Sequence, residues 1–325
     1  MEILVLHPGA LGDIILSLPA LRILREHISG VRITLAANLD FAGAVSFGIA
    51  DKVVSLSALP VHRLYRSMPP VEDARFWRGF DRIVSWTGSR EEVFARNWSH
   101  IHPDVLSPCW KPGPGEGRHV SQLFFEGLRP WIPECAWDPR LQIRLDPEVG
   151  QRGRTWLREQ GWDARKPLLA LHCGAGSPEK RWPLPRYREL ARILCPDWGL
   201  LMIEGPAEPA LVRELNLSGP GILIAGNLPL PLLASVLQHS CRFIGNDSGI
   251  AHLAAGLGIP SILLFGPTNP AHWGPAGSWV SVLRAAENCA ACLSGAAGVR
   301  HTCLEQVSVR AVLAAMRSMP PPLAS

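Results

Sequence analysis

The chain has 325 residues, 47% of them hydrophobic and 18% charged, so it can bury a large core and is long enough for two domains of roughly 150 residues. Its formal net charge of +4 is mild for this length, and no nucleic-acid partner is expected. No apolar run reaches the roughly 18 residues of a membrane-spanning helix, and no signal peptide precedes the first strand, so a cytoplasmic location is expected.

The first domain is predicted to begin with an apolar strand at residues 3–6, a Gly/Pro loop, and a helix over residues 13–27. This order of strand, glycine loop and helix is typical of the start of a doubly wound α/β domain. Further strands are predicted at residues 32–36, 52–56 and 82–86. Because these strands are almost entirely apolar, they indicate a parallel sheet covered on both faces.

Residues 103–147 change in character, with many Pro, Gly and Trp residues around one predicted helix at 119–128. Domain boundaries fall in such stretches, so the linker is predicted near residues 146–150. The two predicted domains are residues 1–148 and 149–325.

The second domain repeats the alternation of helix and strand. Helices are predicted at residues 152–160, 185–194, 208–215, 230–239 and 250–256, and strands at 168–172, 200–203, 222–225, 242–245 and 261–265. A last helix at 307–316 is apolar on one face and could return to the N-terminal domain. The predicted fold class is therefore α/β, with two Rossmann-like, doubly wound parallel-sheet domains facing a cleft.

One predicted strand runs into Asn246, Asp247, Ser248 and Gly249 and then into a helix that carries His252. Backbone N–H groups and short polar side chains collect at such a strand end, where a phosphate or a ribose can bind. A plain helix cap, with the histidine packed on the sheet, is the alternative. The crowding of small and polar residues favours a ligand site.

A glycine loop that contains Gly176 and Ser177 follows another strand and precedes Lys180. The loop is neither a dinucleotide fingerprint nor a P-loop, but it could hold a diphosphate between backbone donors and a lysine charge. A solvated loop lysine is the alternative. Glu208 begins a helix after a third strand, where a carboxylate can accept from ribose hydroxyls or simply cap the helix.

Gly12 and Asp13 lie at the first turn from loop to helix. An aspartate at this position is often an N-cap. The preceding loop at residues 8–12 lets the backbone approach a ligand closely, so the carboxylate could also take a proton from an acceptor hydroxyl.

Cys289, Cys292 and Cys303, together with His301, could hold zinc, but they do not form a complete paired C-x-x-C motif. Reduced structural thiols are the preferred interpretation. No metal site is predicted.

In their order, residues 7–21, 172–183 and 243–267 resemble glycosyltransferase family 9, the heptosyltransferases of lipopolysaccharide core assembly. The resemblance covers nearly the whole chain. It implies a GT-B fold whose C-terminal domain binds the donor nucleotide and whose N-terminal domain binds the acceptor. It also implies inverting, metal-independent transfer, typically of heptose from ADP-heptose to an inner-core acceptor, with no cofactor besides the nucleotide sugar.

The resemblance assigns roles to the motif residues. It implies that Asp13 is the general base and that Lys180 binds the donor phosphate. The other implied ligands are Asp247, Ser248 and Gly249 at the diphosphate, with His252 beside them, Glu208 at the ribose, and Gly12 and His119 at the acceptor. Acceptor phosphates could bind near Arg63, Arg66 and Arg118.

The chain departs from the family where many relatives carry a lysine or arginine after the first strand and this sequence has His7. A different GT-B enzyme, such as a nucleotide-sugar epimerase, and a non-catalytic sugar-nucleotide-binding protein are the alternative functions. The expected partners are a nucleotide-sugar donor and a lipid-linked or oligosaccharide acceptor. Reaching a lipid-linked acceptor would require peripheral contact with the inner face of the cytoplasmic membrane.

Overall fold

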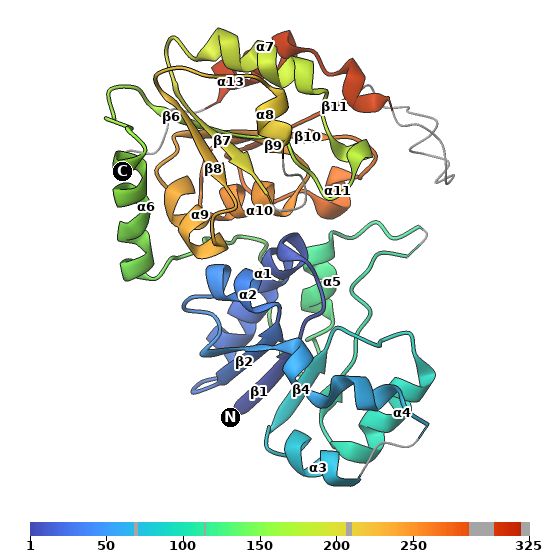
Figure 1. Ribbon diagram of the computed structural model, residues 1–325. Coiled ribbons are helices and arrows are strands. Elements are labelled where there is room, and N and C mark those ends of the chain that lie inside the picture. The colour runs from blue at the N-terminus through green and yellow to red at the C-terminus, as the bar shows by residue number, and fades with distance from the viewer. Residues whose placement is uncertain (68–70, 114, 206–209, 286–301, 320–325) are drawn as a thin grey trace. The chain divides into compact units, whose positions relative to one another are not determined.

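The computed structural model describes residues 1–67, 71–113, 115–205, 210–285 and 302–319 (Figure 1). Its contacts divide the chain into two compact units, Met1–Arg144 and Leu145–Ser325. Residues 146–150, near which the linker was predicted, contain the N-cap and the start of helix α6 (Pro147–Glu159). The carboxylate of Asp146 accepts from the N–H of Glu148, and proline at the first helical position needs no hydrogen-bond partner for its nitrogen.

Unit 1 contains a parallel sheet in the order β3-β2-β1-β4-β5. Its strands are β1 (Glu2–Leu6), β2 (Arg32–Ala37), β3 (Lys52–Ser55), β4 (Arg82–Ser85) and β5 (Val105–Leu106). Its helices are α1 (Leu11–His27), α2 (Leu39–Val45), α3 (Val71–Trp77), α4 (Glu92–Ile101) and α5 (Val120–Glu126), with 3-10 helices η1 (Leu56–Ala58) and η2 (Pro60–Tyr65). The apolar strand β1 is central, which explains why it is almost fully buried.

One apolar cluster of unit 1 contains the buried side chains of Leu4 and Leu6 on β1 together with Trp77, Phe94 and Trp98. These aromatic residues come from α3 and α4, so two short helices contribute large side chains to the core beside the central strand. Helix α1 packs against α5.

Unit 2 contains a parallel sheet in the order β11-β10-β9-β6-β7-β8. Its strands are β6 (Leu168–His172), β7 (Gly199–Glu204), β8 (Ile222–Gly226), β9 (Arg242–Asn246), β10 (Ser261–Phe265) and β11 (Val280–Arg284). Besides α6, its helices are α7 (Leu184–Leu194), α8 (Leu211–Glu214), α9 (Leu230–Leu237), α10 (Gly249–Gly256), α11 (Pro270–Trp273) and α13 (Val309–Ser318), with 3-10 helices η3 (Pro178–Lys180) and η4 (Cys303–Gln306).

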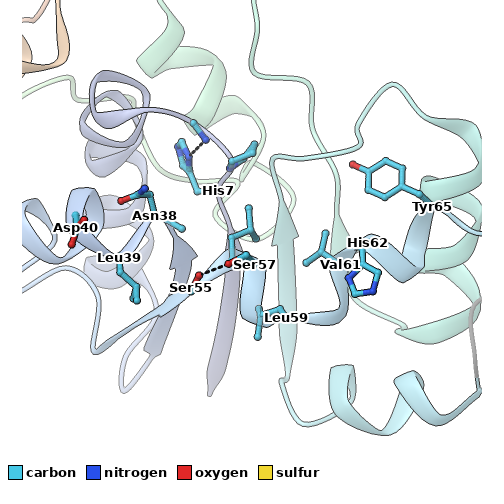
Figure 2. Close-up of a pocket in the computed structure, with 14 residues that line it drawn as sticks. His7, Asn38, Leu39, Asp40, Ser55, Ser57, Leu59, Val61, His62 and Tyr65 are labelled. Carbon is cyan, nitrogen blue, oxygen red and sulfur yellow. Dashed lines mark hydrogen bonds between the residues drawn. The ribbon is translucent and has the colours of Figure 1, made fainter. Parts of the chain in front are cut away.

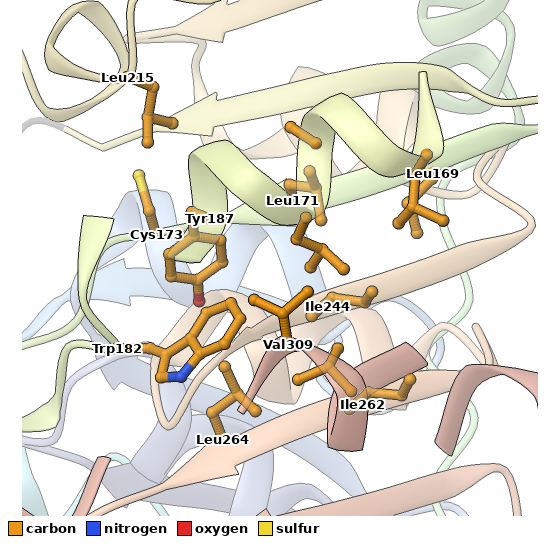
Figure 3. Close-up of a cluster of buried hydrophobic side chains, with 14 of the residues drawn as sticks. Leu169, Leu171, Cys173, Trp182, Tyr187, Leu215, Ile244, Ile262, Leu264 and Val309 are labelled. Carbon is orange, nitrogen blue, oxygen red and sulfur yellow. The ribbon is translucent and has the colours of Figure 1, made fainter. Parts of the chain in front are cut away.

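The core of unit 2 is a cluster in which Trp182 and Tyr187 are fully buried (Figure 3). The indole N–H of Trp182 donates to the carbonyl of Val307 at 2.8 Å, which connects the segment before α7 to the segment before α13. Val309 and Val312 of α13 lie in the same cluster, and α13 packs on α7 and β10. The suggested return of the C-terminal helix to the first domain is therefore wrong, because its apolar face is buried within unit 2.

Both sheets follow the doubly wound order in which the chain starts at a central strand, moves outward, and returns to the other side. The point of reversal lies between β1 and β4 in unit 1 and between β6 and β9 in unit 2. Ligands of open α/β sheets bind at the carboxyl ends of the strands near this point. Within the described residues, no helix is both long enough and apolar enough to cross a membrane.

Candidate functional site

The buried side chain of Asn246, at the end of β9, connects three segments of unit 2. Its amide nitrogen donates to the carbonyls of Cys173 at 2.9 Å and Gly174 at 3.1 Å, in the loop after β6. Its amide oxygen accepts from the backbone N–H of Trp182 at 2.9 Å. The loop after β6, the segment that carries Lys180, and the end of β9 are thereby held at one edge of the sheet.

Lys180 lies at the end of η3, and its ammonium group donates to the carboxylate of Asp247 at 2.8 Å. The Asp247 side chain is 6% exposed and the Lys180 side chain 32% exposed, so the lysine faces solvent over a buried carboxylate. The ring of His252 in α10 lies 4.0 Å from the second carboxylate oxygen. The structure thus brings together three of the residues predicted from the sequence.

Ser248 is the N-cap of α10, and its hydroxyl accepts from the N–H of Ala251 at 3.3 Å. The same hydroxyl lies 3.2 Å from Nδ1 of His172, the last residue of β6. Burial lowers the pKa of His172 from 6.5 to about 4, so the imidazole is neutral at pH 7. Gly249 is the first residue of α10, where backbone N–H groups have no acceptor within the helix.

The remaining predicted donor residues differ in position. Gly176 is exposed, and Ser177 is the half-buried residue that precedes η3. Glu208 lies outside the described residues. Glu204, which the sequence reasoning missed, ends β7 and accepts from the N–H of Ala210 at 2.6 Å. A carboxylate at the end of an otherwise apolar strand was the signal that could have identified it.

In unit 1, His7 follows β1 and is fully buried. Its Nδ1 accepts from the N–H of Gly9 at 3.0 Å, while one oxygen of the Asp13 carboxylate accepts from the N–H of Ala10 at 3.0 Å. A Cβ atom on Gly9 would lie 2.6 Å from Cε1 of His7 and 2.5 Å from Cβ of Asp13. The loop therefore needs glycine here, because its backbone passes between these two side chains.

The imidazole of His7 packs against Trp86, Trp110 and Phe124, with ring centroids 5.2, 6.1 and 5.5 Å away. Burial lowers its pKa from 6.5 to about 3, so His7 is neutral at pH 7. Asp13 is half-buried in the first turn of α1. It is close enough to the surface for an acceptor hydroxyl to reach it.

A pocket of about 800 Å³ opens at the carboxyl ends of β1, β2 and β3 (Figure 2). Its walls come from the loop after β1, the start of α2, η1 and η2. The lining residues are His7, Pro8, Gly9, Ala37, Asn38, Leu39, Asp40, Ser55, Leu56, Ser57, Leu59, Val61, His62 and Tyr65. The loop that positions Asp13 thus forms one wall of a pocket large enough for a sugar.

The two predicted acceptor residues do not line this pocket. Gly12 is the second residue of α1, and His119 is the N-cap of α5, where its Nδ1 accepts from the N–H of Ser121 at 3.2 Å. Arg118 makes two charged hydrogen bonds to Glu116, at 2.8 and 2.7 Å. This pair holds the guanidinium of Arg118 beside the Glu116 carboxylate.

In the part of the chain that the structure describes, no group of three or more His, Cys, Asp or Glu side chains could hold a metal ion. Cys303 is buried in η4. Cys289, Cys292 and His301 lie outside the described residues.

The site after β9 in unit 2 and the site after β1 in unit 1 offer different chemical groups to a ligand. In unit 2, the ammonium of Lys180, the hydroxyl of Ser248 and the first N–H groups of α10 provide donors for phosphate oxygens. In unit 1, the carboxylate of Asp13 lies beside a pocket with hydroxyl and amide groups. A carboxylate so placed can accept a proton from a bound hydroxyl.

Comparison with known proteins links both units to one group of enzymes. Residues 141–300 match the sequence model of glycosyltransferase family 9 (heptosyltransferase). Lipopolysaccharide heptosyltransferase 1 of Pseudomonas aeruginosa is 26% identical over 329 residues, which cover 90% of this chain and 86% of that protein. Lipopolysaccharide heptosyltransferase 1 of Escherichia coli K12 is 22% identical over 308 residues, covering 88% and 94%.

Solved structures share the fold of the whole chain. A glycosyl transferase family 9 protein from Veillonella parvula superposes with a TM-score of 0.79 at 20% identity, covering 98% of this chain and 96% of that one. ADP-heptose lps heptosyltransferase II of E. coli gives a TM-score of 0.71 at 17% identity, with 98% of each chain covered. E. coli heptosyltransferase WaaC with ADP gives 0.67 at 19% identity, covering 98% and 99%.

Two Rossmann-like domains with these neighbours show the GT-B fold, which confirms the predicted fold class. The family model and the relatives that span nearly the whole chain point to one family of glycosyltransferases. The match at residues 141–300 and these relatives confirm the predicted resemblance to glycosyltransferase family 9, the heptosyltransferase family.

Proposed function

We propose that this enzyme transfers a heptose from ADP-heptose to a sugar of the lipopolysaccharide inner core or of a related glycan. The names of the relatives support this proposal, since they are lipopolysaccharide heptosyltransferases, and one similar structure holds ADP-2-deoxy-2-fluoro heptose. The observation that carries it is the arrangement of Lys180, Asp247 and Ser248 at the start of α10. This arrangement offers donors for a diphosphate at the strand ends where nucleotides bind in such folds.

In the proposed reaction, Asp13 is the general base of an inverting displacement. The acceptor oxygen forms a bond to the anomeric carbon of the donor sugar, and its proton passes to the Asp13 carboxylate. The bond between that carbon and the diphosphate oxygen breaks on the opposite side, and ADP leaves with the electron pair. The positive charge of Lys180 and the N–H groups of α10 stabilise the negative charge that develops on the diphosphate, so the proposed reaction needs no metal and no other cofactor.

Lys180 can bind a phosphate without losing Asp247, because an ammonium group has three donors. The 2.8 Å pair holds the long lysine side chain in one place before the donor arrives. Less rotamer entropy is then lost when the diphosphate binds. We assign Gly176, Ser177, Gly249, His252 and Glu208 to the same donor site as proposals.

The donor site is tested by calorimetry with ADP, ADP-heptose, UDP and GDP. We expect selective binding of the adenine nucleotides, and Lys180→Ala should weaken it by about 10- to 100-fold, as for a lost charged hydrogen bond. Lys166→Ala is the matched control, because Lys166 is exposed in the same unit and donates only to the carbonyl of Cys195. Preference for another nucleotide, or equal loss in both variants, would contradict the assignment.

Activity separates this function from the alternatives. An inverting transferase needs an acceptor and yields a glycoside of inverted anomeric configuration, measurable by NMR, and its rate should survive EDTA. A nucleotide-sugar epimerase would instead change the donor without any acceptor, and a binding protein would do neither.

A lipid-linked acceptor also implies peripheral membrane contact, which we propose for unit 1. Sedimentation with anionic vesicles at low salt tests this contact. Protein that stays in the supernatant would oppose it.

A further inference from the structure

The pocket in unit 1 has an unusual charge for a site in an enzyme with anionic substrates. Among the described residues that line it, none is a lysine or an arginine, and Asp40 is the one acidic side chain. His7 is neutral at pH 7, because burial lowers its pKa to about 3. A carboxylate or phosphate in this pocket would therefore meet another carboxylate without a fixed cation to offset it.

The uncharged part of the lining suits a sugar. The hydroxyls of Ser55 and Ser57 are 2.8 Å apart at the end of β3, and the Asn38 side chain lies at the start of α2. The Tyr65 ring is 45% exposed, and its hydroxyl lies 3.2 Å from that of Thr87. Hydroxyl and amide groups beside an aromatic ring and aliphatic side chains match the alternating polar and apolar surface of a pyranose.

Three arginines of unit 1 outside this lining, Arg118, Arg25 and Arg96, have carboxylate or carbonyl partners. Arg118 pairs with Glu116, as described above, and Arg25 makes hydrogen bonds of 2.6 and 3.0 Å to Asp51. One guanidinium nitrogen of Arg96 donates to the carbonyl of Ser67 at 3.3 Å. These cations have roles in the fold and are not placed at the pocket wall.

We propose that the sugar unit that enters this pocket as acceptor is uncharged, with hydroxyl groups but no carboxylate or phosphate of its own. The Asp40 carboxylate, at one end of the lining, accepts hydrogen bonds from hydroxyls of this sugar. The inference rests on the proposed function only in treating the pocket as the acceptor side. Charged groups elsewhere on the acceptor glycan are outside this pocket and are not restricted.

Matched glycosides test the charge preference. Octyl glucoside and octyl glucuronide, and the corresponding galactose pair, differ only in a CH₂OH group against a carboxylate. Below their micelle-forming concentrations, saturation-transfer NMR on the ADP-loaded protein should show at least tenfold weaker binding for the acidic member of each pair. Equal or tighter binding of the acidic members would overturn the proposal, and so would the absence of contact with all four glycosides.

Substitution of Asp40 shows whether the pocket causes the preference. Asp40→Asn should reduce the tenfold difference to less than about threefold, because the repulsion is gone while a hydrogen-bonding side chain remains. Asp40→Lys should favour the acidic member. Glu91→Gln is the control, since Glu91 is an exposed acid of the same unit outside the pocket. An unchanged preference in both Asp40 variants, or a change in the control as well, would overturn the assignment.

The binding experiment needs no transfer, so the two proposals can fail separately. If ADP-heptose is neither bound nor consumed while the neutral glycosides still bind better, the proposed donor is wrong and the pocket assignment stands. If transfer occurs, linkage analysis of the product identifies the substituted residue. A new glycosidic bond on an uncharged sugar supports the inference, and one on a uronic, ulosonic or phosphorylated residue overturns it.

Discussion

A buried histidine directly follows β1 in unit 1 and ends β6 in unit 2, but the two imidazoles have different partners. His7 after β1 accepts from the N–H of Gly9, two residues further along the same loop. His172 at the end of β6 lies 3.2 Å from the hydroxyl of Ser248, which belongs to another strand end. The first contact is local, and the second joins parts of the chain that are 76 residues apart.

Two buried asparagines show the same contrast. Asn246 in unit 2 joins the loop after β6, the segment before α7 and the end of β9, directly at the donor residues. Asn97 in unit 1 donates to the carbonyls of Leu64 and Arg66, at 2.9 and 2.8 Å, and so holds the segment that presents Tyr65. Unit 2 therefore fixes its ligand residues by buried polar contacts, while unit 1 fixes mainly the walls of an open pocket.

This difference suits the two proposed ligands. A diphosphate is the same in every donor molecule, so a site whose groups are held in advance loses little entropy on binding. A glycan acceptor differs between enzymes of one fold, and exposed loops can vary without disturbing the core. The two units can be altered separately to test this division.

The largest effect is expected at the proposed base. Asp13→Asn removes the proton acceptor but keeps the shape of the side chain, so kcat for transfer should fall by about 10²- to 10⁴-fold. The nucleotide affinity should not change, because Asp13 lies in unit 1. Steady-state kinetics and calorimetry on the same preparation measure both quantities. A kcat within tenfold of the wild type would contradict the role of Asp13.

The asparagine pair gives the next largest effect. Asn246→Ala leaves the N–H of Trp182 and two carbonyls without their partner, so it should lower the free energy of unfolding by about 3 kcal/mol. It should also weaken ADP binding by about tenfold or more, because Lys180 is no longer held. Asn97→Ala should cost about 2 kcal/mol and leave ADP binding unchanged. Urea unfolding and calorimetry separate these outcomes, and an equal effect on ADP binding would remove the distinction between the units.

The sequence predicted the architecture well, because apolar runs carry the signal for buried parallel strands. The runs at residues 168–172 and 242–245 correspond to β6 and β9 and gave the correct strand ends to within one residue. Strands β5 and β11 were missed. β5 has only two residues, which is too short a run to recognise. β11 is a half-exposed edge strand that contains polar residues, so it shows no continuous apolar run.

The contacts within the site could not be predicted. Lys180 and Asp247 were both proposed as donor ligands, but their ion pair was not predicted. The pair forms because the segment after β6 that carries Lys180 is hydrogen-bonded to the end of β9. The same holds for Asn246, whose three partners are defined only by the strand order. The pocket of unit 1 was missed as well, since Ser55, Asn38 and Tyr65 carry no common motif and meet only at the strand ends.

Two of the buried histidines, His7 and His172, predict a loss of stability in acid. Their pKa values in the folded state, about 3 for His7 and about 4 for His172, lie below the ordinary 6.5, so the unfolded chain binds protons first as the pH falls. Stability is therefore complete above about pH 6.5 and decreases by about 1.4 kcal/mol per pH unit for each histidine. For His172 the loss ends near pH 4 and totals about 3 kcal/mol.

Urea unfolding between pH 7 and 4.5 measures this dependence. His172→Gln and His7→Gln should each reduce the slope, whatever their cost at pH 7. His27→Gln alters an exposed histidine of α1 and should leave the slope unchanged. An identical slope in the wild type and both buried-histidine variants would show that other groups cause the acid sensitivity.

The smallest effect compares one glycine in each strand-end loop. A methyl group at Gly9 would lie 2.5 Å from Cβ of Asp13 and 2.6 Å from Cε1 of His7, so Gly9→Ala should cost about 2 kcal/mol and displace the proposed base. An added Cβ at Gly176 meets no atom within 4 Å, and Gly176→Ala should change stability by less than about 0.5 kcal/mol. We expect kcat to fall by about tenfold or more only for the first variant, with ADP binding retained in both. If Gly176→Ala proved the more damaging, the space around these two glycines would not decide the effect of the added methyl group, and the prediction would be wrong.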